Sequence, residues 1–223
     1  MDLMNAIKKR KSIRAFKSKP VSKAVVEELL RAAIMAPSGS NAQPWKFFVV
    51  TGQCKKELDV LLIPCVEEGL KISERLTMIE AKLGNRTGTN KTAFNVLFSK
   101  LHQEKKLTSE GTVKSLLRHY EAPVAIFITL DHSQRVNILA AGAAIEHILL
   151  AACDKGLGTC WLTFPYLRTK SAERIIKKHL KIPASEKIVS SIALGYPDVK
   201  APINDFRAPR NKFSTFVEWF GWE

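Results

Sequence analysis

Apolar and polar positions along the chain follow two different periods, and each run of one period predicts an element. Residues 25, 26, 29, 30 and 33 are apolar and share one helix face, with Ser22 at the N-cap position and Pro37 beyond the end. Runs rich in β-branched and aromatic residues predict four strands, over 45–51, 124–130, 158–163 and 187–195. Amphipathic spacing predicts further helices over 3–11, about 53–63, about 66–82 and about 170–181.

The segment of about 135–155 is the most apolar helix that the pattern predicts. Apart from three positions, every residue over 138–152 is Ala, Ile or Leu. A helix that is apolar almost all round is buried, so we expect this one at the centre of the fold, ended by Gly156. Four strands interleaved with long helices predict an α+β or α/β domain whose helices cover a sheet.

The composition is that of a packed, soluble domain. Of the 223 residues, 46% are hydrophobic and 25% are charged, which argues against intrinsic disorder. No run of 18 apolar residues is present, so we expect no transmembrane helix. Residues 1–11 are charged and no apolar stretch follows them, so we expect no secretory leader and a cytoplasmic location.

The charge balance points to an anionic partner. The formal net charge is +14, and residues 1–23 hold eight of the cations against Asp2 alone. The partner is either nucleic acid or the phosphate of a small ligand; the simplest alternative is a solvated basic surface. No helix-turn-helix, zinc finger or aromatic-rich sheet motif supports nucleic acid. The four cysteines and five histidines are scattered, so we expect no metal site.

Two segments carry side chains suited to a phosphorylated ligand. The first is Arg10-Lys11-Ser12-Ile13-Arg14, at a helix-to-strand junction. In an extended chain residues 10, 12 and 14 project to one side, so that two guanidinium groups and a hydroxyl converge as a phosphate monoester requires. Basic helix ends are also common without a ligand.

The second segment is the loop Pro37-Ser38-Gly39-Ser40-Asn41-Ala42-Gln43-Pro44-Trp45. Its glycine and serines permit close approach of the backbone to a ligand, and Asn41 and Gln43 offer both donors and acceptors to the edge of a heterocycle. An ordinary Asx-type turn is the alternative.

The sequence pattern of two regions does not predict a clear structural role. Residues of about 64–121 show helical patterns around a polar connection at 84–90. The tail of about 205–223 carries six of the chain's 18 aromatic residues, at positions 206, 213, 216, 219, 220 and 222. So much apolar surface is unusual in a solvated tail, so we expect it to dock on its own domain or on a second subunit.

Taken together, four motifs in order resemble the flavin-dependent nitroreductase family. An R-x-S-x-R element matches residues 10–14, and P-S-x-x-N-x-Q-P-W matches residues 37–45 in full. L-A-A-x-x-x-G-L-G-x-x-W matches residues 150–161, and a strand ending in A-L-G-Y-P matches residues 193–197, followed by a basic Pro209-Arg210. No motif covers the stretch of about 64–121.

The resemblance implies a three-layer α+β fold, with a central, mostly antiparallel sheet, helices on both faces, and an intertwined homodimer. It implies a single domain over 1–223, with a helical cap or insertion at about 64–121 that selects the acceptor. It also implies a C-terminal tail at about 205–223 that wraps the partner, FMN bound at the dimer interface, and NADH or NADPH as the hydride donor.

Carried over residue by residue, the resemblance gives Arg10, Lys11, Ser12 and Arg14 as contacts to the phosphate and ribityl chain, and Arg210 as a C-terminal phosphate contact. The loop of the other subunit would approach the flavin. A backbone N–H at Leu162 or Thr163 would lie near flavin N5. The full set assigned to the cofactor is Arg10, Lys11, Ser12, Arg14, Pro37, Ser38, Asn41, Gln43, Leu162, Thr163 and Arg210.

The implied activity is reduction of nitroaromatic, quinone or similar conjugated acceptors by NAD(P)H in a ping-pong cycle. No catalytic side chain is nominated, because protons can come from water or from the flavin. Two alternatives keep the fold. One is a different flavin reaction, such as reductive dehalogenation, ring oxidation or flavin breakdown. The other is a non-enzymatic store or sensor of FMN.

Overall fold

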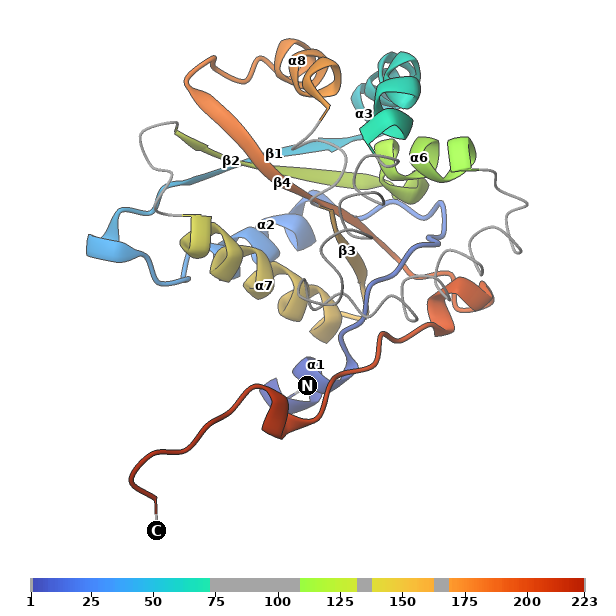
Figure 1. Cartoon of the computed structure of the whole chain (residues 1–223). Helices are drawn as coiled ribbons and strands as arrows, with labels where there is room; N and C mark the ends of the chain where they lie inside the picture. Colours follow the sequence, from blue (N-terminus) through green and yellow to red (C-terminus); the bar gives the residue numbers. More distant parts are fainter. Residues whose placement is uncertain (1, 73–108, 132–137, 163–168, 223) are drawn as a thin grey trace.

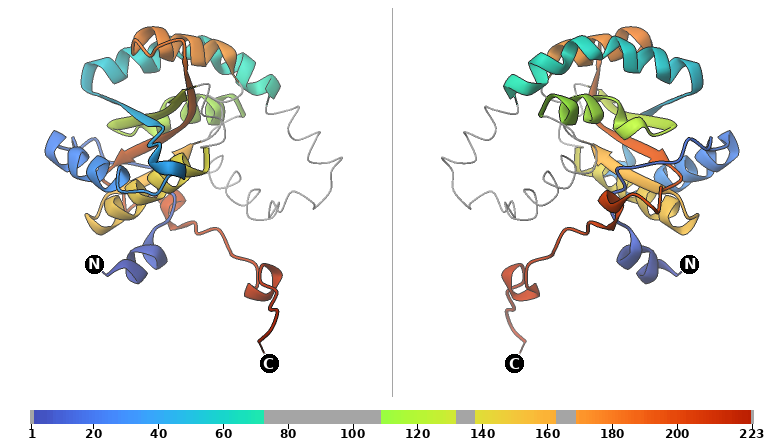
Figure 2. Two further views of the ribbon diagram at one scale, coloured as in Figure 1. Left: turned by 90° about the vertical axis from the view of Figure 1, so that its left-hand side faces the viewer. Right: turned by 90° about the vertical axis from the view of Figure 1, so that its right-hand side faces the viewer.

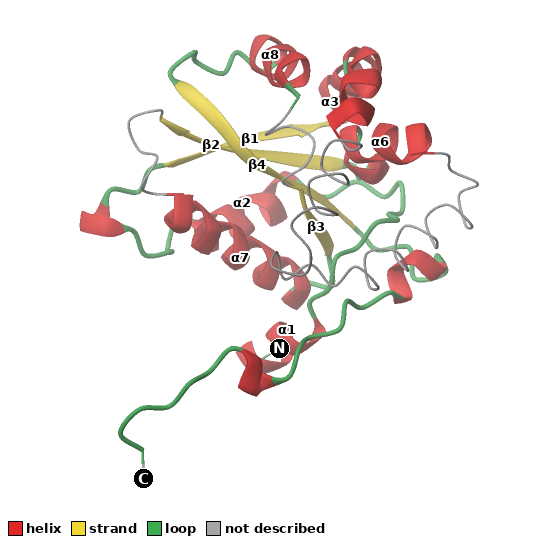
Figure 3. Cartoon of the chain, viewed as in Figure 1, coloured by secondary structure: helices red, strands yellow, loops and turns green. Residues whose placement is uncertain are grey.

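A computed structural model of the chain describes residues 2–72, 109–131, 138–162 and 169–222. These residues form a four-stranded antiparallel sheet with the strand order β1-β2-β4-β3 (Figures 1 and 3). The strands are β1 (Trp45–Thr51), β2 (Val124–Asp131), β3 (Gly158–Leu162) and β4 (Glu186–Gly195). All four predicted strands are confirmed, with bounds that shift by no more than one residue.

Helices cover both faces of the sheet. The α-helices that lie wholly within the described residues are α1 (Leu3–Lys9), α2 (Lys23–Ala33), α3 (Gly52–Leu61), α6 (Ser109–Leu117), α7 (Ile138–Asp154) and α8 (Lys170–His179). α2 and α7 lie on one face, and α3, α6 and α8 lie on the other (Figure 1). Short 3₁₀ turns are η1 (Gly39–Asn41), η2 (Ile63–Cys65), η4 (His119–Glu121), η6 (Pro202–Asp205) and η7 (Phe213–Thr215). The expected three-layer α+β architecture is confirmed.

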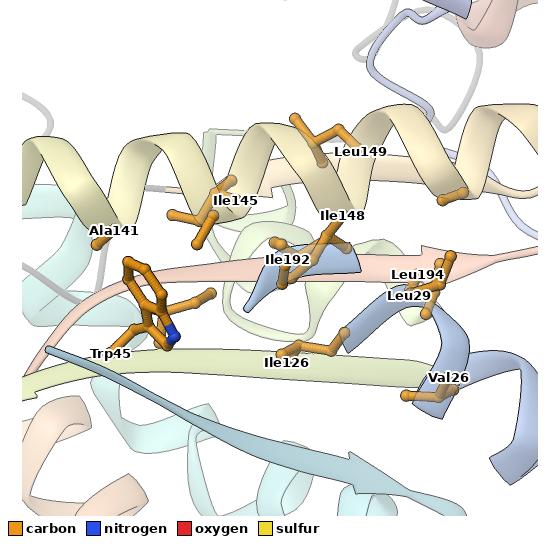
Figure 4. Packing of buried hydrophobic residues seen from close by; sticks show 14 of the residues in the cluster. Val26, Leu29, Trp45, Ile126, Ala141, Ile145, Ile148, Leu149, Ile192 and Leu194 are labelled. Carbon is orange, nitrogen blue, oxygen red and sulfur yellow. The ribbon is translucent and has the colours of Figure 1, made fainter. Parts of the chain in front are cut away.

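The alternation of side chains along the central strands produces two hydrophobic cores. On one face Ile126 packs with Ile148 of α7 and Leu29 of α2 (Figure 4). Its neighbour Phe127 points the other way, into a core that includes Ile176 of α8. Because both faces of β2 are buried, its sequence is apolar at almost every position, as the pattern indicated.

Several helix bounds differ from the prediction. α1 ends at Lys9 instead of residue 11, because the chain from Arg10 onward is extended. α8 ends at His179 instead of residue 181. The predicted helix over 66–82 is helical as far as residue 72, and its remainder lies outside the described residues, as does the connection at 84–90. Among the described residues, no helix has both the length and the apolar character that crossing a membrane requires.

The helices on opposite faces of the sheet end in the same way. After α7, Gly156 adopts φ +71°, and the next N–H returns to a carbonyl of the last turn at 2.8 Å. After α8 the equivalent residue is Lys181 at φ +53°, with a matching bond of 2.9 Å. The predicted role of Gly156 is confirmed. The end of α8 was missed because a lysine at the left-handed position gives no sequence signal.

Candidate functional site

Residues 10–14 lie extended against the edge strand β3. Ser12 pairs with Thr159 in a parallel bridge, and the Ile13 N–H donates to the Thr159 carbonyl at 2.8 Å. Gly158 permits this approach, since a Cβ there would lie within 2.8–2.9 Å of three atoms of the Ile13 side chain. Ile13 is buried, and the alternation of an extended chain directs Ser12 and Arg14 to the opposite side.

The buried side chain of Asn204, in η6, fixes the end of this segment. Its Oδ1 accepts from the Arg14 N–H at 2.8 Å and from the Ala15 N–H at 3.2 Å. Its Nδ2 donates at 2.8 Å to the carbonyls of Ala15 and Asp198. One amide therefore ties the cationic segment to the chain just before the tail. Asn204 could not be predicted from the sequence, because Arg14 and Ala15 lie about 190 positions away.

The start of the tail is tied to α1. The Arg207 guanidinium donates to the carbonyl of Lys8 and, at 3.5 Å, to the carbonyl of Arg10. Beyond this contact the chain runs away from the body of the molecule (Figures 1 and 2). The bond places residues 206–210 opposite residues 10–14.

The two segments together enclose a cavity of about 60 Å³. Its lining residues are Arg10, Lys11, Ser12, Arg14, Phe206, Arg207, Ala208 and Arg210. The structure thus brings together five of the residues that the sequence assigned to a cofactor. It adds Arg207, which was missed although it lies three positions before Arg210 in the same basic segment.

The cavity holds more positive than negative charge. The Nε atom of Arg10 lies 3.4 Å from Glu146 of α7. For the other four cations of the cavity, the described part of the chain provides no ion pair. A cluster of like charges in such a confined space favours an anion.

Arg14 is partly buried at this cavity. Its buried Nε has no hydrogen-bond acceptor in the described residues, and its Nη1 donates to the Ser12 carbonyl at 3.4 Å. Two titratable groups that influence the pKa of its guanidinium are Cys160 and Tyr120. Burial raises the pKa of the Tyr120 phenol and of the Cys160 thiol, so both are neutral at physiological pH. Within the described residues, the Arg14 charge is therefore not compensated by a protein anion.

The loop over 37–45 lies apart from the cavity. It projects near the start of α7, whereas α1 and the tail lie near the end of that helix (Figure 1). None of its four assigned residues, Pro37, Ser38, Asn41 and Gln43, lines the cavity. A single chain thus separates the two predicted halves of the site.

The loop itself has an unusual backbone. Ser40, Asn41 and Gln43 have φ values of +51°, +55° and +44°. The Ser38 hydroxyl oxygen accepts from the Gln43 N–H at 3.0 Å, and the Gln43 amide donates to the Asn41 carbonyl at 3.4 Å. Asn tolerates this region, whereas Ser and Gln adopt it at a cost of about 1–2 kcal/mol each. Such strain is typical of functional loops.

The last two assigned residues lie at the end of β3. Leu162 is buried, and its carbonyl accepts from the Ser190 hydroxyl at 3.1 Å. The Ser190 oxygen in turn accepts from the Trp161 indole N–H at 2.5 Å. Leu162 does not line the cavity, and Thr163 lies outside the described residues. Within the described ranges, no group of three His, Cys, Asp or Glu side chains is arranged to hold a metal ion.

Comparison with known proteins identifies the class. The model of the nitroreductase family matches residues 7–196, so the chain belongs to this family of oxidoreductases. It is 28% identical over 226 residues to the 4-nitrobenzoate reductase of Pseudomonas putida, covering 100% of this chain and 97% of that protein. It is also 28% identical to the iodotyrosine deiodinase of Thermotoga neapolitana, covering 96% and 98% of the two chains.

Solved structures confirm the fold. The FMN-dependent nitroreductase NfnB from Mycobacterium smegmatis, in complex with NADPH, superimposes with a TM-score of 0.76 at 22% identity. The match covers 98% of this chain and 100% of that one. The predicted family and fold are both confirmed.

The close contact between Gly158 and Ile13 gives a testable expectation. Replacing Gly158 with Ala should lower the free energy of unfolding by about 1–3 kcal/mol, because a β-branched neighbour cannot move aside easily. Urea unfolding checks this. Gly142→Ala is the control, since its Cβ would meet nothing closer than 3.9 Å in a helix that favours Ala, so stability should hold or rise. Equal changes in the free energy of unfolding for the two substitutions would contradict the close contact between Gly158 and Ile13.

Proposed function

We propose that this protein binds FMN, takes hydride from NADH or NADPH, and reduces a nitroaromatic, quinone or similar conjugated acceptor in a ping-pong cycle. The observation that carries the proposal is the cavity between residues 10–14 and 206–210, where five cations meet. Membership of an oxidoreductase family supports it, as does the dependence of NfnB on FMN and its complex with NADPH.

The cavity fits the phosphate end of FMN. A phosphate monoester carries about −1.5 to −2 charge at pH 7 and has three acceptor oxygens. Guanidinium groups match such oxygens in pairs, and the Ser12 hydroxyl can donate to one of them. The phosphate would supply an anion for the four cations that have no ion pair in the described residues. Residues 10, 11, 12, 14, 207 and 210 would form this subsite.

The chain itself binds and orients the reactants. FMN, when bound, supplies the two-electron chemistry that amino-acid side chains lack. Hydride transfer needs stacked rings at near contact distance, so the role of the protein is to hold both partners in that geometry. Donors fixed near the isoalloxazine would stabilise negative charge there. We therefore assign no side chain to proton transfer.

We also propose a homodimer in which the loop of one copy serves the cofactor of the other. This arrangement would let Pro37, Ser38, Asn41 and Gln43 approach the flavin, although a single chain keeps them apart from the cavity. The exposed apolar surface supports it, because Phe220 and Trp222 of the tail are 81% and 80% exposed. We propose that the tail wraps the partner.

Two further assignments stay predictions. A cytoplasmic location agrees with four free cysteines, since oxidising compartments favour disulfides. The other is the cap over the acceptor at about 64–121, of which residues 73–108 lie outside the described residues. The flanking parts contribute to the core beside α8, with Val66 on one side and Leu117 on the other.

One alternative has a specific observation in its favour. The identity to the iodotyrosine deiodinase equals that to the 4-nitrobenzoate reductase, so reductive dehalogenation on the same flavin is a second candidate. Turnover of halogenated and nitro aromatic compounds, compared on one preparation, would distinguish the two reactions.

The cofactor and the hydride donor can be tested together. The purified protein should show a flavin absorption spectrum that bleaches when NADH or NADPH is added without oxygen. A spectrum that persists with both donors would favour a flavin store. If reconstitution with FMN gave no flavin spectrum, the proposal would be wrong.

The phosphate subsite predicts a specific loss of affinity. Arg210→Ala should raise the Kd for FMN by about 10- to 100-fold, because a charge-assisted hydrogen bond contributes about 1.5–3 kcal/mol. Fluorescence titration of FMN measures this. Lys23→Ala is the control, because its side chain is 91% exposed and pairs with Glu27 on α2, outside the cavity. Equal Kd values for the two variants would show that charge, and not the subsite, governs affinity.

The role of the tail can be tested by shortening it. A chain that ends at residue 212 keeps Arg207 and Arg210 and loses the aromatic residues from Phe213 onward. We expect it to be monomeric at concentrations where the full chain is dimeric, as measured by light scattering. A shortened chain that dimerises with unchanged stability would contradict the proposed wrapping.

A further inference from the structure

Arg10 is the cation of the cavity that has a carboxylate beside it in the described residues. Its Nε atom lies 3.4 Å from a carboxylate oxygen of Glu146, and the two side chains are 22% and 43% exposed. Arg10 lines the cavity, whereas Glu146 does not. The carboxylate therefore contacts the guanidinium from outside the space that a ligand would occupy.

The geometry of α7 places Glu146 at this point. Gly142, Glu146 and Cys153 are spaced by four and seven positions, so they share one face of the helix. A Cβ at Gly142 would lie 3.9 Å from the Trp161 ring of β3. The Cys153 thiol donates to the Ala6 carbonyl of α1 at 3.8 Å. Glu146 thus lies on the face of α7 that covers the edge strand and the end of α1.

The backbone on each side of this ion pair is fixed. Ile145 and Ile148, which flank Glu146, are buried in the core between α7 and the sheet (Figure 4). The Arg10 N–H donates to the Ala6 carbonyl at 2.9 Å, at the end of α1. The freedom that remains belongs to the long Arg10 side chain, which can adopt many rotamers in solvent. A carboxylate on a buried helix restricts that freedom.

The atom that faces Glu146 matters for the chemistry. A guanidinium has five N–H donors, one on Nε and four on the two Nη atoms. A carboxylate beside Nε leaves the Nη donors to a ligand, and their planar arrangement matches the oxygens of a phosphate. The ion pair therefore holds Arg10 without using the end of the guanidinium.

From this geometry we propose that Glu146 is a positioning residue, whose carboxylate holds the Arg10 guanidinium so that its Nη groups face the phosphate of the cofactor. The inference rests on the proposed FMN function and adds to it a carboxylate beside a cationic site. The charge of Glu146 alone would oppose the binding of an anion. Its removal is nevertheless expected to weaken FMN binding, because Arg10 would lose its fixed orientation.

A double-mutant cycle with two flavins tests this role. Glu146→Ala should raise the Kd for FMN about five- to tenfold in fluorescence titrations. The Kd for riboflavin, which has no phosphate, should stay within twofold. In an Arg10→Ala background the same substitution should not raise the Kd for FMN, because the group through which Glu146 acts is absent. Alanine is the best helix former, so α7 should keep its structure.

Glu28→Ala is the matched control. The Glu28 carboxylate lies on α2, is 55% exposed and pairs with Lys155 just beyond the end of α7. Neither residue lines the cavity. The control removes the same charge and breaks a similar ion pair, so its Kd for FMN should stay within twofold of the wild type.

Three results would overturn the positioning role. An unchanged or lower Kd for FMN in Glu146→Ala would show that the carboxylate contributes only its charge. An equal rise of the Kd for FMN and for riboflavin would show that Glu146 acts through the fold. An equal rise of the Kd for FMN with and without Arg10 would show that it acts through another group.

The two proposals can fail separately. If the wild-type protein binds FMN and one of these three results is found, the positioning role falls and the FMN function stands. If the wild-type protein does not bind FMN, the function falls, and calorimetric titration of the same proteins with inorganic phosphate decides the positioning role. A loss of phosphate affinity in Glu146→Ala that vanishes in the Arg10→Ala background supports it. An equal loss in both backgrounds, no loss, or no binding of phosphate by the wild type overturns it.

Discussion

Mutual repulsion among five cations is the constraint on which the site depends. Two unit charges about 4 Å apart interact by about 4 kcal/mol at an effective dielectric constant of 20. Holding Arg10, Lys11, Arg14, Arg207 and Arg210 around one small cavity, with Glu146 as a single paired carboxylate in the described residues, is therefore unfavourable without a ligand. A bound anion attracts all of these cations, so the electrostatic energy of the cluster becomes favourable.

Neutral contacts to the backbone oppose the repulsion. Asn204 fixes the chain on both sides of Arg14, and Arg207 is held by two carbonyl groups at the end of α1. Gly158 lets the cationic segment lie directly on β3. None of these contacts neutralises the cations. The cavity therefore keeps its positive electrostatic potential, while the contacts hold the surrounding chain in place. A design based on salt bridges would stabilise the fold and weaken the attraction for an anion.

Much of the fold could be predicted from the sequence, because burial leaves a local pattern. The strand around Ile126 and the helix around Ile148 are apolar since both pack in the core. The cationic segment at 10–14 was also predicted, because its charges are adjacent. Asn204 and Arg207 were not, since their roles depend on partners far along the chain.

Other features of the structure leave no recognisable pattern in the sequence. The left-handed turn at His119–Glu121 contains no glycine, so nothing in the sequence marks it, and Tyr120 resembles any core aromatic. The motif from Pro37 to Gln43 could be assigned to a loop from its sequence, but its position relative to the cavity could not. That position depends on how the whole chain folds. The middle of the 64–121 region carries no motif that would predict its packing.

The hydrogen bonds from Arg207 to the end of α1 have an evolutionary consequence. Its guanidinium reaches the carbonyl oxygens of residues 8 and 10, which every amino acid possesses. The side chain of Lys8 is therefore free to vary by drift without loosening the tail. Position 207 has no such freedom, because no other residue offers the same planar set of donors. The two ends of one contact are thus expected to diverge at different rates among descendants of this chain.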